Sequence, residues 1–579
     1  MCGFLYIRLK DKDENFINMF ESALALMSYR GKDASGVYQM ENNYFGHVRL
    51  SILDLSPRSN QPVIGKKNIL LFTGEIYNYK ALVETANSDT LAISELIENN
   101  FNFRDKLSGM YALLKFDKQN NIVHVLRDFY GEKPVYYYMD DKIFIVSSTI
   151  KAITYILLKK FNKKLKINQI SLYEYLLSGY VREPRTIYEE IYMLSSGHEL
   201  TFSSDWKLKI YNTVNELLDN SILSFKKYAQ YSLNTTDVQP ALLLSSGVDS
   251  TYILNMLAEQ SLDFKILTYR SFCHVDESKV AFENASKICK NVNIDFIENS
   301  IDIHGLYSEY PHLLEQPSSD GIQLFNILSN ARMSNDNKKL KLVFLGTGGD
   351  ELYGGYNSFK NFNKISILTK LNYLKNLVPS KYKRFFYHLH SKDKEFSYYF
   401  LYRICDRILP LAPKEIVEQI YFEFSQEMTK YWSDHFKGQP LYKIKLCESL
   451  DYMRNQLLRD SDNISLYCGY EARNPLLSIS AYNIKPDNKK SLKAELLKHN
   501  IKFNKKRGFT FSDNEYLINF VLQKIYVLNE VYNIFSNKIM HALLNIDHYD
   551  QSLVRKLYIL FAWFDANKIE QAQLQNFCL

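Results

Sequence analysis

The spacing of hydrophobic and polar residues changes twice along the chain. Over residues 1–205, short apolar runs are bounded by Gly, Asp and Asn, a pattern typical of strands joined by turns. Two stretches with helical periodicity interrupt these runs, near residues 13–28 and 89–99. We therefore expect an α+β layered sandwich in this part of the chain.

From residue 236 onward, apolar runs lead into glycine-containing turns and then into helical stretches. The run 241–244 is followed by such a turn, a helix and a second apolar run, and residues 342–345 repeat the pattern. This alternation predicts βαβ units and a parallel α/β sheet that binds its ligand at the strand ends. Residues 357–579 have mainly helical periodicity, which predicts a helical C-terminal portion.

Residues 206–235 are polar and rich in Asn and Ser, with a helical stretch around 213–229. We interpret them as a linker region between two domains, 1–205 and 236–579. A chain of 579 residues is long enough to give each of two domains a full core.

Composition and charge exclude several classes of protein. Hydrophobic residues make up 46% of the chain and charged residues 23%, so composition gives no reason to expect disorder. The net charge of +7 is spread without a basic stripe, and we expect no nucleic-acid partner. The 7 cysteines are scattered without a CxxC pair, which argues against a disulfide framework or a zinc site.

The sequence gives no sign of membrane attachment. The longest uncharged apolar run, residues 557–564, is far too short to span a bilayer. No signal peptide is expected, since the motif residues begin at Cys2. We expect a cytoplasmic protein without a membrane partner.

Cys2 directly follows the initiator methionine, and its chemistry depends on that place. After removal of the methionine, Cys2 would carry an α-amine of pKa about 7.7–8.0 beside a thiol of pKa about 8.5. One residue then supplies both a nucleophile and a general base, as in N-terminal threonine enzymes. A cysteine at this position is weak evidence by itself, so the assignment of Cys2 as a nucleophile depends on the surrounding motifs.

Short motifs follow one another through the first part of the chain. In order, they are MCG (1–3), RGKDASG (30–36), HVRLSILD (47–54), TGEIYN (73–78), SDT (88–90) and RDFYGEKP (127–134). This series resembles the glutaminase domain of the asparagine synthetase B family over essentially the first 200 residues. The resemblance implies an Ntn-type αββα sandwich in which Cys2 attacks the side-chain amide of glutamine and releases ammonia.

The same resemblance assigns the binding of glutamine. Arg49 would clamp the α-carboxylate, since its planar fork matches that group, and Glu75 and Asp89 would bind the α-ammonium. The alternative for these three residues is an ordinary surface ion pair. One departure is Thr73, because the family usually has an asparagine there, whose amide forms the oxyanion hole with the N–H of Gly74. Losing one such donor typically costs about 10²–10³ in rate. We therefore expect slow glutamine hydrolysis unless the threonine hydroxyl donates instead.

A second anion-binding motif begins where the apolar run 241–244 opens into SSGVDS (245–250) and then into a helix. Backbone N–H groups at a helix N-terminus, aided by hydroxyls, make a nest for phosphate; a simple strand-to-helix turn is the alternative. Walker A spacing and its lysine are absent. The loop resembles the SGGxDS pyrophosphate loop of the ATP pyrophosphatase group, which implies cleavage of ATP between its α and β phosphates. The implied ATP and pyrophosphate site consists of Leu244, Ser245, Ser246, Gly247, Asp249, Ser250 and Gly346.

Residues 345–356, LGTGGDELYGGY, follow another buried strand. They look like the GxGGDExFGGY motif of asparagine synthetases. By that resemblance, Asp249 and Asp350 hold Mg²⁺ on the phosphates, which suits a cation that prefers oxygen ligands. Glu351 would line the acyl-acceptor side.

Three further segments agree with this resemblance. EQPSSDG (315–321) resembles EQPxxDG, EARNPLL (471–477) resembles EARxPFLD, and NKKRGF (504–509) resembles KxGF. The last motif places the family's lysine at Lys506, where it can neutralise charge on the α-phosphate and the leaving pyrophosphate. Two positions depart from the family: Ser478 replaces the aspartate that ends the second motif, and Asn463 stands where an arginine is usual.

The resemblance as a whole implies a glutamine-dependent asparagine synthetase, a ligase that forms a carbon–nitrogen bond. Ammonia from glutamine would displace AMP from an acyl-adenylate made from aspartate and ATP, giving asparagine, AMP, pyrophosphate and glutamate. Glutamine, ATP and aspartate or another carboxylate would be its small-molecule partners, with ATP and Mg²⁺ as cofactors. Homodimers are common in that family, although no interface is visible in the sequence.

Other functions remain open at this point. The closest alternative keeps the machinery and amidates another carboxylate, such as a sugar uronic acid in polysaccharide biosynthesis, or closes a lactam or peptide ring. The departures at Thr73, Asn463 and Ser478 favour such a specialised acceptor. A non-catalytic regulatory relative is an alternative of another class, against which the intact Cys2 and Asp350 argue. A ligase making GMP or NAD fits less well, since those enzymes lack an N-terminal cysteine domain of this kind.

Overall fold

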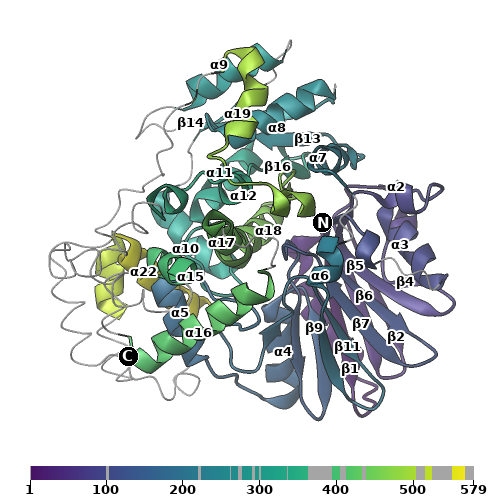
Figure 1. Ribbon diagram of the computed structural model, residues 1–579. Coiled ribbons are helices and arrows are strands. Elements are labelled where there is room, and N and C mark those ends of the chain that lie inside the picture. Colours follow the sequence, from purple (N-terminus) through teal and green to yellow (C-terminus); the bar gives the residue numbers. More distant parts are fainter. Residues whose placement is uncertain are drawn as a thin grey trace.

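The computed structural model describes residues 2–99, 104–219, 223–260, 262–270, 277–289, 294–298, 302–334, 337–362, 394–404, 412–432, 439–501, 503, 516–524 and 551–567. Two antiparallel sheets of six strands each stack face to face in its N-terminal part (Figure 1). The first sheet has the order β10 (Tyr192–Met193), β8 (Tyr136–Met139), β9 (Ile143–Ser147), β1 (Cys2–Leu9), β3 (Asn43–Arg49) and β2 (Ala34–Met40). The second has the order β12 (Leu208–Asn212), β11 (His198–Phe202), β7 (Ile122–Arg127), β6 (Gly109–Asp117), β5 (Asn68–Ile76) and β4 (Val63–Ile64).

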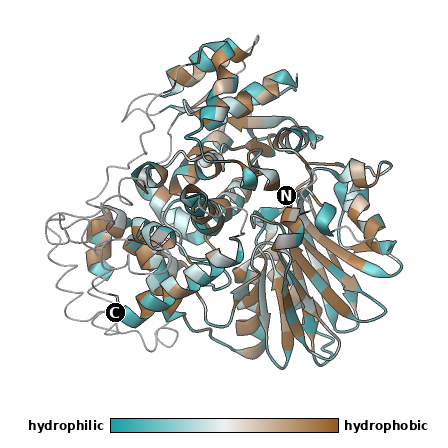
Figure 2. Ribbon diagram, in the orientation of Figure 1, coloured by the Kyte–Doolittle hydropathy of each residue, from teal (hydrophilic) through white to brown (hydrophobic). Residues whose placement is uncertain are grey.

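Alternation of side chains along the strands explains why both faces of these sheets are covered. In β1, Phe4 and Tyr6 lie in the core between the two sheets, whereas Leu5 and Ile7 lie in the core on the outer face. The strands are accordingly brown along most of their length in Figure 2. Helices α1 (Phe16–Ala25) and α4 (Ile150–Phe161) cover the first sheet, and α2 (Tyr79–Leu82) and α3 (Asp89–Glu98) cover the second. This order of layers confirms the expected αββα sandwich.

The stretch 206–235 contains regular structure. Strand β12 pairs with β11, so the second sheet extends to Asn212, past the residue at which we expected the first domain to end. Helices α6 (Val214–Asp219) and α7 (Phe225–Asn234) follow it. Helix α7 places Tyr228 against Tyr77 of the sandwich, with ring centroids 5.5 Å apart. This stretch therefore packs against the sandwich.

A five-stranded parallel sheet forms the centre of the C-terminal part, as the alternating pattern predicted. Its order is β15 (Ile294–Glu298), β14 (Lys265–Arg270), β13 (Pro240–Leu243), β16 (Leu342–Phe344) and β17 (Glu471–Arg473). The first three strands in sequence run outward from β13 to one edge, and the last two run to the other edge. The order therefore reverses between β13 and β16, which is where open parallel sheets bind their ligands.

Helices surround this sheet and fill the rest of the C-terminal part (Figure 1). Those that pack on its strands are α8 (Val248–Glu259), α9 (Ser278–Ile288), α11 (Ile322–Met333) and α18 (Arg459–Tyr467). The others are α10 (Ile303–Leu313), α12 (Gly349–Tyr353), α15 (Lys394–Arg403), α16 (Lys414–Lys430), α17 (Pro440–Cys447), α19 (Lys490–Leu496) and α22 (Gln551–Ala566), with a π-helical segment Glu448–Leu458 joining α17 to α18. Helix α5 (Gln169–Ser178) of the N-terminal part packs against α16 and α22. The helical C-terminal portion is thus confirmed over the described residues.

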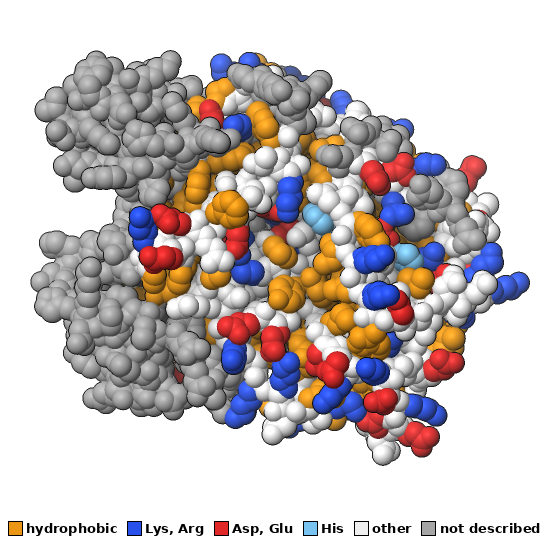
Figure 3. All heavy atoms as spheres, turned by 60° about the horizontal axis from the view of Figure 1, so that its bottom comes forward, with side chains coloured by type: hydrophobic (Ala, Val, Ile, Leu, Met, Phe, Trp, Pro, Cys, Tyr) orange, Lys and Arg blue, Asp and Glu red, His pale blue; other side chains and the backbone are white. Residues whose placement is uncertain are grey.

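The two parts share one continuous core, and the N-terminal end of the chain lies at their junction (Figure 1). Phe129 of the sandwich, for example, packs edge-to-face on Tyr482, with centroids 5.9 Å apart. Lys, Arg, Asp and Glu side chains are interspersed on the face shown in Figure 3. Among the described helices, none is both long and apolar enough to cross a membrane.

Candidate active site

Cys2 opens the inner strand β1 and lies opposite Arg49 of β3 in the pairing register. Its main-chain carbonyl accepts hydrogen bonds from Thr73 Oγ1 at 2.8 Å and from Arg30 Nε at 3.3 Å. Thr73 is fully buried, and a hydroxyl carries a single hydrogen. Thr73 therefore fixes the backbone of Cys2, and in this arrangement its hydroxyl does not donate to an oxyanion.

Burial raises the pKa of the Cys2 thiol. The N-terminal amine, a hydrogen bond from the Leu50 backbone and the charge of Arg49 offset this effect only in part. The thiol is therefore protonated at neutral pH and needs a base before it can attack. After removal of the methionine, the α-amine of Cys2 itself is such a base.

Gly74 has no room for a side chain. Its φ of +121° lies in a region that favours glycine, and a Cβ there would come within 2.0 Å of the Met110 carbonyl oxygen on the paired strand β6. The sequence motif TGE therefore requires glycine at its second position for reasons of backbone geometry.

Replacing Gly74 by alanine should destabilise the protein by more than about 2 kcal/mol, because it adds a left-handed backbone penalty to a clash with fixed main chain. Urea unfolding measures this change. Gly305→Ala is the matched control, since a Cβ there meets nothing within 4 Å. Because Gly305 lies within α10, that change should stabilise the protein by about 0.5–1 kcal/mol. Equal stabilities of the two variants would contradict the strand geometry at Gly74.

The predicted carboxylate clamp, Arg49, is held by the loop that follows β3. Its Nη1 donates to the Ser56 carbonyl at 2.9 Å and to Asn60 Oδ1 at 2.8 Å. Its Nη2 donates to the carbonyls of Leu53, at 3.2 Å, and of Asp54. Loop oxygens therefore already surround both terminal nitrogens of the guanidinium.

Two carboxylates that the sequence analysis assigned to ammonium binding lie together in the interior. Asp89, at the start of α3, accepts hydrogen bonds from the Ile76 N–H at 3.0 Å and the Thr90 N–H at 2.7 Å. Glu75 Oε1 lies 3.1 Å from Nη2 of Arg473, and Glu75 Oε2 is buried without a hydrogen bond within the described part of the chain. Burial raises the pKa of Asp89 to about 6, and burial also raises the pKa of Glu75 despite the charge of Arg473. A surface ion pair is thereby excluded for both residues.

The SSGVDS loop closes on itself at the carboxyl end of β13. Ser250 Oγ accepts from the Ser245 N–H at 3.1 Å and lies 3.0 Å from Ser245 Oγ, which in turn accepts from the Gly247 N–H at 3.2 Å. Gly247 is the N-cap of α8, and Ser246 donates to Glu277 Oε2 at 2.7 Å. The predicted loop residues Ser245, Ser246, Gly247 and Ser250 are therefore gathered at a helix N-terminus, an arrangement suited to phosphate.

Asp249 and Asp350 meet across the switch point between β13 and β16. The ammonium of Lys489 lies 2.5 Å from Asp249 Oδ2 and 2.5 Å from Asp350 Oδ1, so these two oxygens are no further apart than twice that distance. The glycines of the second motif allow this approach, since a Cβ on Gly349 would come within 2.2 Å of the Asp249 carboxyl. Burial lowers the pKa of Lys489, but the two carboxylates outweigh it and the net shift is upward.

Sequence reasoning missed Lys489. It follows Asn488, and both residues have left-handed φ angles, 59° and 60°. The only local signal was the asparagine of a turn. Lys506, to which we had given the charge-neutralising role, lies outside the described residues.

Glu351 is buried beside the same loop. Its Oε2 accepts from the Gly348 N–H at 3.0 Å, and its Oε1 accepts from the Tyr356 hydroxyl at 2.5 Å. The Tyr356 ring lies 6.2 Å from that of Tyr452, whose hydroxyl donates to Asp320 Oδ2 at 2.5 Å. The EQPSSDG and GGDE motifs, far apart in sequence, thus meet at one aromatic wall.

Two protein families match the chain, one over each of its two parts. Residues 1–211 match the glutamine amidotransferase domain family, and residues 231–480 match the asparagine synthase family. The chain belongs to the glutamine-hydrolysing asparagine synthetase family. As a member of it, the protein is an enzyme of the carbon–nitrogen ligase class, and the family uses ATP.

Relatives of this asparagine synthetase family member are identical to it at about a quarter of the aligned positions. A putative glutamine-hydrolysing asparagine synthetase 2 of Methanocaldococcus jannaschii is 28% identical over 66% of this chain and 80% of its own length. Glutamine-hydrolysing asparagine synthetase 1 of Bacillus subtilis is 25% identical over 84% of this chain and 80% of its own. A protein named amidase chry2 of Gibberella zeae is 24% identical over 59% of this chain and 56% of its own.

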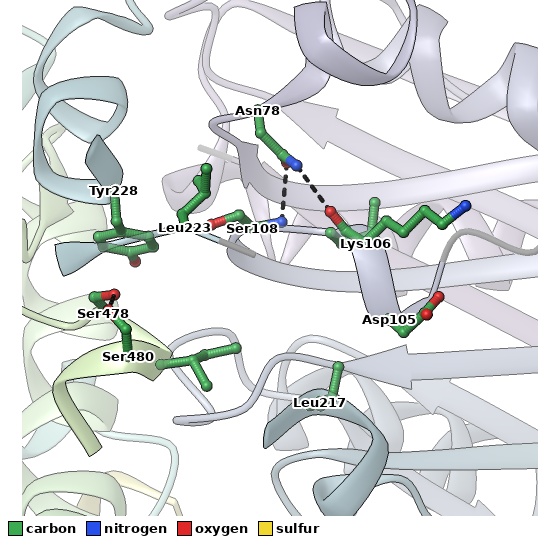
Figure 4. A pocket seen from close by; sticks show the side chains of 11 residues that line it. Asn78, Asp105, Lys106, Ser108, Leu217, Leu223, Tyr228, Ser478 and Ser480 are labelled. Carbon is green, nitrogen blue, oxygen red and sulfur yellow. Dashed lines mark hydrogen bonds between the residues drawn. The ribbon is translucent and has the colours of Figure 1, made fainter. Parts of the chain in front are cut away.

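Two departures from the family motifs lie between the domains of this synthetase family member. Asn463 accepts from the Tyr29 hydroxyl of the sandwich at 2.9 Å and donates to the Leu313 carbonyl at 2.6 Å. Ser478 lines a small pocket with Tyr228 and Asn78 (Figure 4). These contacts place both residues at the junction of the two domains.

The residues around Asp249 and Asp350 fit Mg²⁺. In the structure, a cationic nitrogen is already held between the two carboxylates. Mg²⁺ in nucleotide sites is usually held by one or two carboxylates, with phosphate oxygens and waters completing its coordination. No group of three or more metal-ligating side chains occurs among the residues that the structure describes.

Proposed function

We propose that this protein is a glutamine-dependent asparagine synthetase, with Cys2 releasing ammonia and the Asp249–Asp350 site activating aspartate with ATP. The observation that carries the proposal is the pairing of these two centres in one chain. Cys2 starts an inner strand of the sandwich, and the two carboxylates converge on one cation at the switch point of the parallel sheet.

In the glutamine half, the α-amine of Cys2 takes the proton of the thiol, and the sulfur attacks the side-chain amide carbon of glutamine. Ammonia leaves, and water then hydrolyses the thioester to give glutamate. The N–H of Gly74 would face the oxyanion, while Thr73 holds the Cys2 backbone. Glu75 and Asp89 would bind the α-ammonium.

Glutamine binding should weaken below about pH 6 if Asp89 binds the α-ammonium. Its pKa is raised to about 6, so acid converts it to a neutral carboxyl that no longer attracts a cation. Calorimetry on the non-reacting Cys2→Ala protein should show Kd rising about tenfold per pH unit below that value. Asp89→Asn should bind glutamine weakly at every pH. A Kd that stays constant between pH 7 and 5 would contradict the assignment.

In the synthetase half, a carboxylate oxygen of aspartate attacks the α-phosphorus of ATP, and pyrophosphate leaves. Lys489 offers a positive charge at this point, and Mg²⁺ held by Asp249 and Asp350 would shield the phosphate oxygens. Ammonia then attacks the acyl carbon, and AMP leaves. Glu351, on the adjacent loop, accepts the proton that ammonia releases.

A buried polar layer between the two centres supports the transfer of ammonia between them. Asp462 of α18 pairs with Arg30 Nη2 at 2.7 Å and with Lys133 Nζ at 3.0 Å, both from the sandwich. Asn474 donates to Glu132 Oε2 at 3.1 Å across the same junction. These contacts shelter the junction from bulk water, in which ammonia would become ammonium.

A sugar uronic acid is the second candidate for the acceptor. One observation favours it: Tyr356 and Tyr452 form an aromatic wall between the carboxylates of Glu351 and Asp320. Aromatic faces pack against sugar rings, and carboxylates accept from sugar hydroxyls. Aspartate offers neither a ring nor hydroxyl groups.

Pyrophosphate release from Mg-ATP distinguishes the two acceptors. Ammonium salt serves as nitrogen source, so that the result does not depend on the glutamine half, and aspartate is compared with a panel of uronic acids. Release that depends on aspartate supports asparagine synthesis. Release with a uronic acid alone moves the assignment to the second candidate.

A further inference from the structure

Two side chains of strand β17, in the synthetase domain, reach the glutamine centre. The Arg473 side chain is fully buried, and its Nη2 lies 3.1 Å from Glu75 Oε1 of strand β5. Its Nε lies 2.5 Å from Oε1 of Glu471, two residues earlier on the same strand. The negative charge of Glu471 in turn lies near enough to Cys2 to raise the pKa of its thiol.

The same guanidinium also fixes the connection between the domains. Its Nη1 donates to the carbonyl of Ser232 at 3.2 Å, within α7, and to that of Thr235 at 2.6 Å, just after the helix. Its carbon lies 5.6 Å from the centre of the Tyr77 ring, which follows β5. The orientation of Arg473 is therefore set by the sandwich, by α7 and by the parallel sheet together.

The main chain of Arg473 touches the nucleotide loop. Arg473 lies opposite Phe344 in the parallel register, and its carbonyl accepts from the Leu345 N–H at 2.9 Å. Leu345 is the residue before Gly346, where the loop that carries Asp350 and Glu351 begins. One residue thus contacts the proposed ammonium-binding carboxylate through its side chain and the start of the nucleotide loop through its backbone.

Glu75 needs such a partner to work as an ammonium receptor. Burial raises its pKa, Arg473 lowers it only in part, and the nearby Asp89 raises it further, so the net shift is upward and the guanidinium is the partner that limits it. Without the guanidinium, two buried carboxylates would face each other, and such a pair shares a proton. Arg473 Nη2 forms an ion pair with Oε1 at 3.1 Å, and neither that Nη2 nor Oε2 has a hydrogen bond among the described residues.

We propose that Arg473 is a positioning residue of the glutamine site, supplied by the synthetase domain, which holds the Glu75 side chain oriented toward the α-ammonium of glutamine. The glutamine site is then complete only when strand β17 is docked against the sandwich. This inference rests on the proposed function, because it takes Glu75 as the ammonium-binding carboxylate.

The test compares Arg473→Lys with Arg182→Lys. Lysine keeps the positive charge of Arg473 but lacks the planar guanidinium and its several N–H donors. Arg182 forms a similar buried pair between the domains, with Nε 2.6 Å from Asp451 Oδ1, and it does not belong to the glutamine site. Glutamate release gives KM and kcat for glutamine, and pyrophosphate release with ammonium reports the synthetase half.

Arg473→Lys should raise the KM for glutamine at least about tenfold while ammonium-driven pyrophosphate release changes by less than about twofold. Arg182→Lys should leave the KM for glutamine unchanged. Combining Arg473→Lys with Glu75→Gln should raise KM little beyond the larger single effect, because both changes remove one interaction. An unchanged KM in Arg473→Lys, or equal losses with both nitrogen sources, would overturn the inference.

A structure of the Cys2→Ala protein with glutamine tests the inference even if Arg473→Lys fails to fold. Glu75 is expected between Arg473 and the ligand's ammonium. A Glu75 side chain turned away from Arg473 in that complex would overturn the positioning role alone. Failure of the wild-type protein to release glutamate from glutamine would instead overturn the proposed function, and this inference with it.

Discussion

Replacing Cys2 by alanine should lower the glutamine-driven reaction by at least about 10⁴-fold, because it removes both the nucleophile and the only route to a thioester. The ammonium-driven reaction should continue at the wild-type rate, since Cys2 lies in the sandwich and the nucleotide loop at the switch point of the other sheet. The measurement is pyrophosphate release with each nitrogen source at saturating ATP and acceptor.

The control for this change is another cysteine of intermediate exposure. Cys289, at the end of α9, is also a free cysteine whose pKa burial raises, and Cys289→Ala should alter neither reaction. A Cys2→Ala protein that still makes amide from glutamine would contradict the assignment of the nucleophile. Loss of the ammonium-driven reaction as well would mean that Cys2 supports the fold of the junction rather than ammonia release.

Replacing Asp350 by asparagine should lower both the glutamine-driven and the ammonium-driven reactions by about 10³-fold. The change keeps the shape of the side chain but removes the negative charge that, with Asp249, holds a cation at the switch point. Both reactions should slow by the same factor, because the acid is activated before ammonia attacks it. ATP–pyrophosphate exchange with the acid substrate measures this step directly.

Asp295→Asn is the matched control for Asp350→Asn. Asp295 lies on the edge strand β15 of the same sheet and pairs with Lys265 at 2.8 Å. Its replacement should leave exchange within about twofold of wild type, since a partly exposed ion pair contributes little. ATP–pyrophosphate exchange at the wild-type rate in Asp350→Asn would contradict the assignment of Asp350 to a metal and phosphate site.

Local patterns were enough to predict the elements that carry the site. The SSGVDS and LGTGGDELYGGY motifs each follow a buried strand, and both loops lie at the carboxyl ends of β13 and β16 as expected. The strand order that brings them together depends on pairing between distant segments, but βαβ units constrain it strongly. The candidate nucleotide site could therefore be predicted from short stretches of sequence.

Other features could not be predicted, each for a physical reason. Strand β12 was interpreted as linker because its residues are mostly exposed, so it lacks the apolar alternation of a covered strand. The π-helical segment Glu448–Leu458 has the spacing of an ordinary helix in sequence, and polar residues such as Asp451 and Arg454 are buried in it. Lys489 and Arg473 lie far along the chain from their partners, and no local pattern indicates such contacts.

Transfer of the amide nitrogen tests the central claim most directly. The protein is incubated with Mg-ATP, aspartate and glutamine labelled with heavy nitrogen in its amide group, in the presence of unlabelled ammonium. If ammonia passes between the two sites through a sheltered junction, the asparagine should carry the heavy label. It should form in amounts equal to those of pyrophosphate and glutamate. Unlabelled asparagine, or glutamate release without any amide product, would contradict the coupling of Cys2 to the synthetase site.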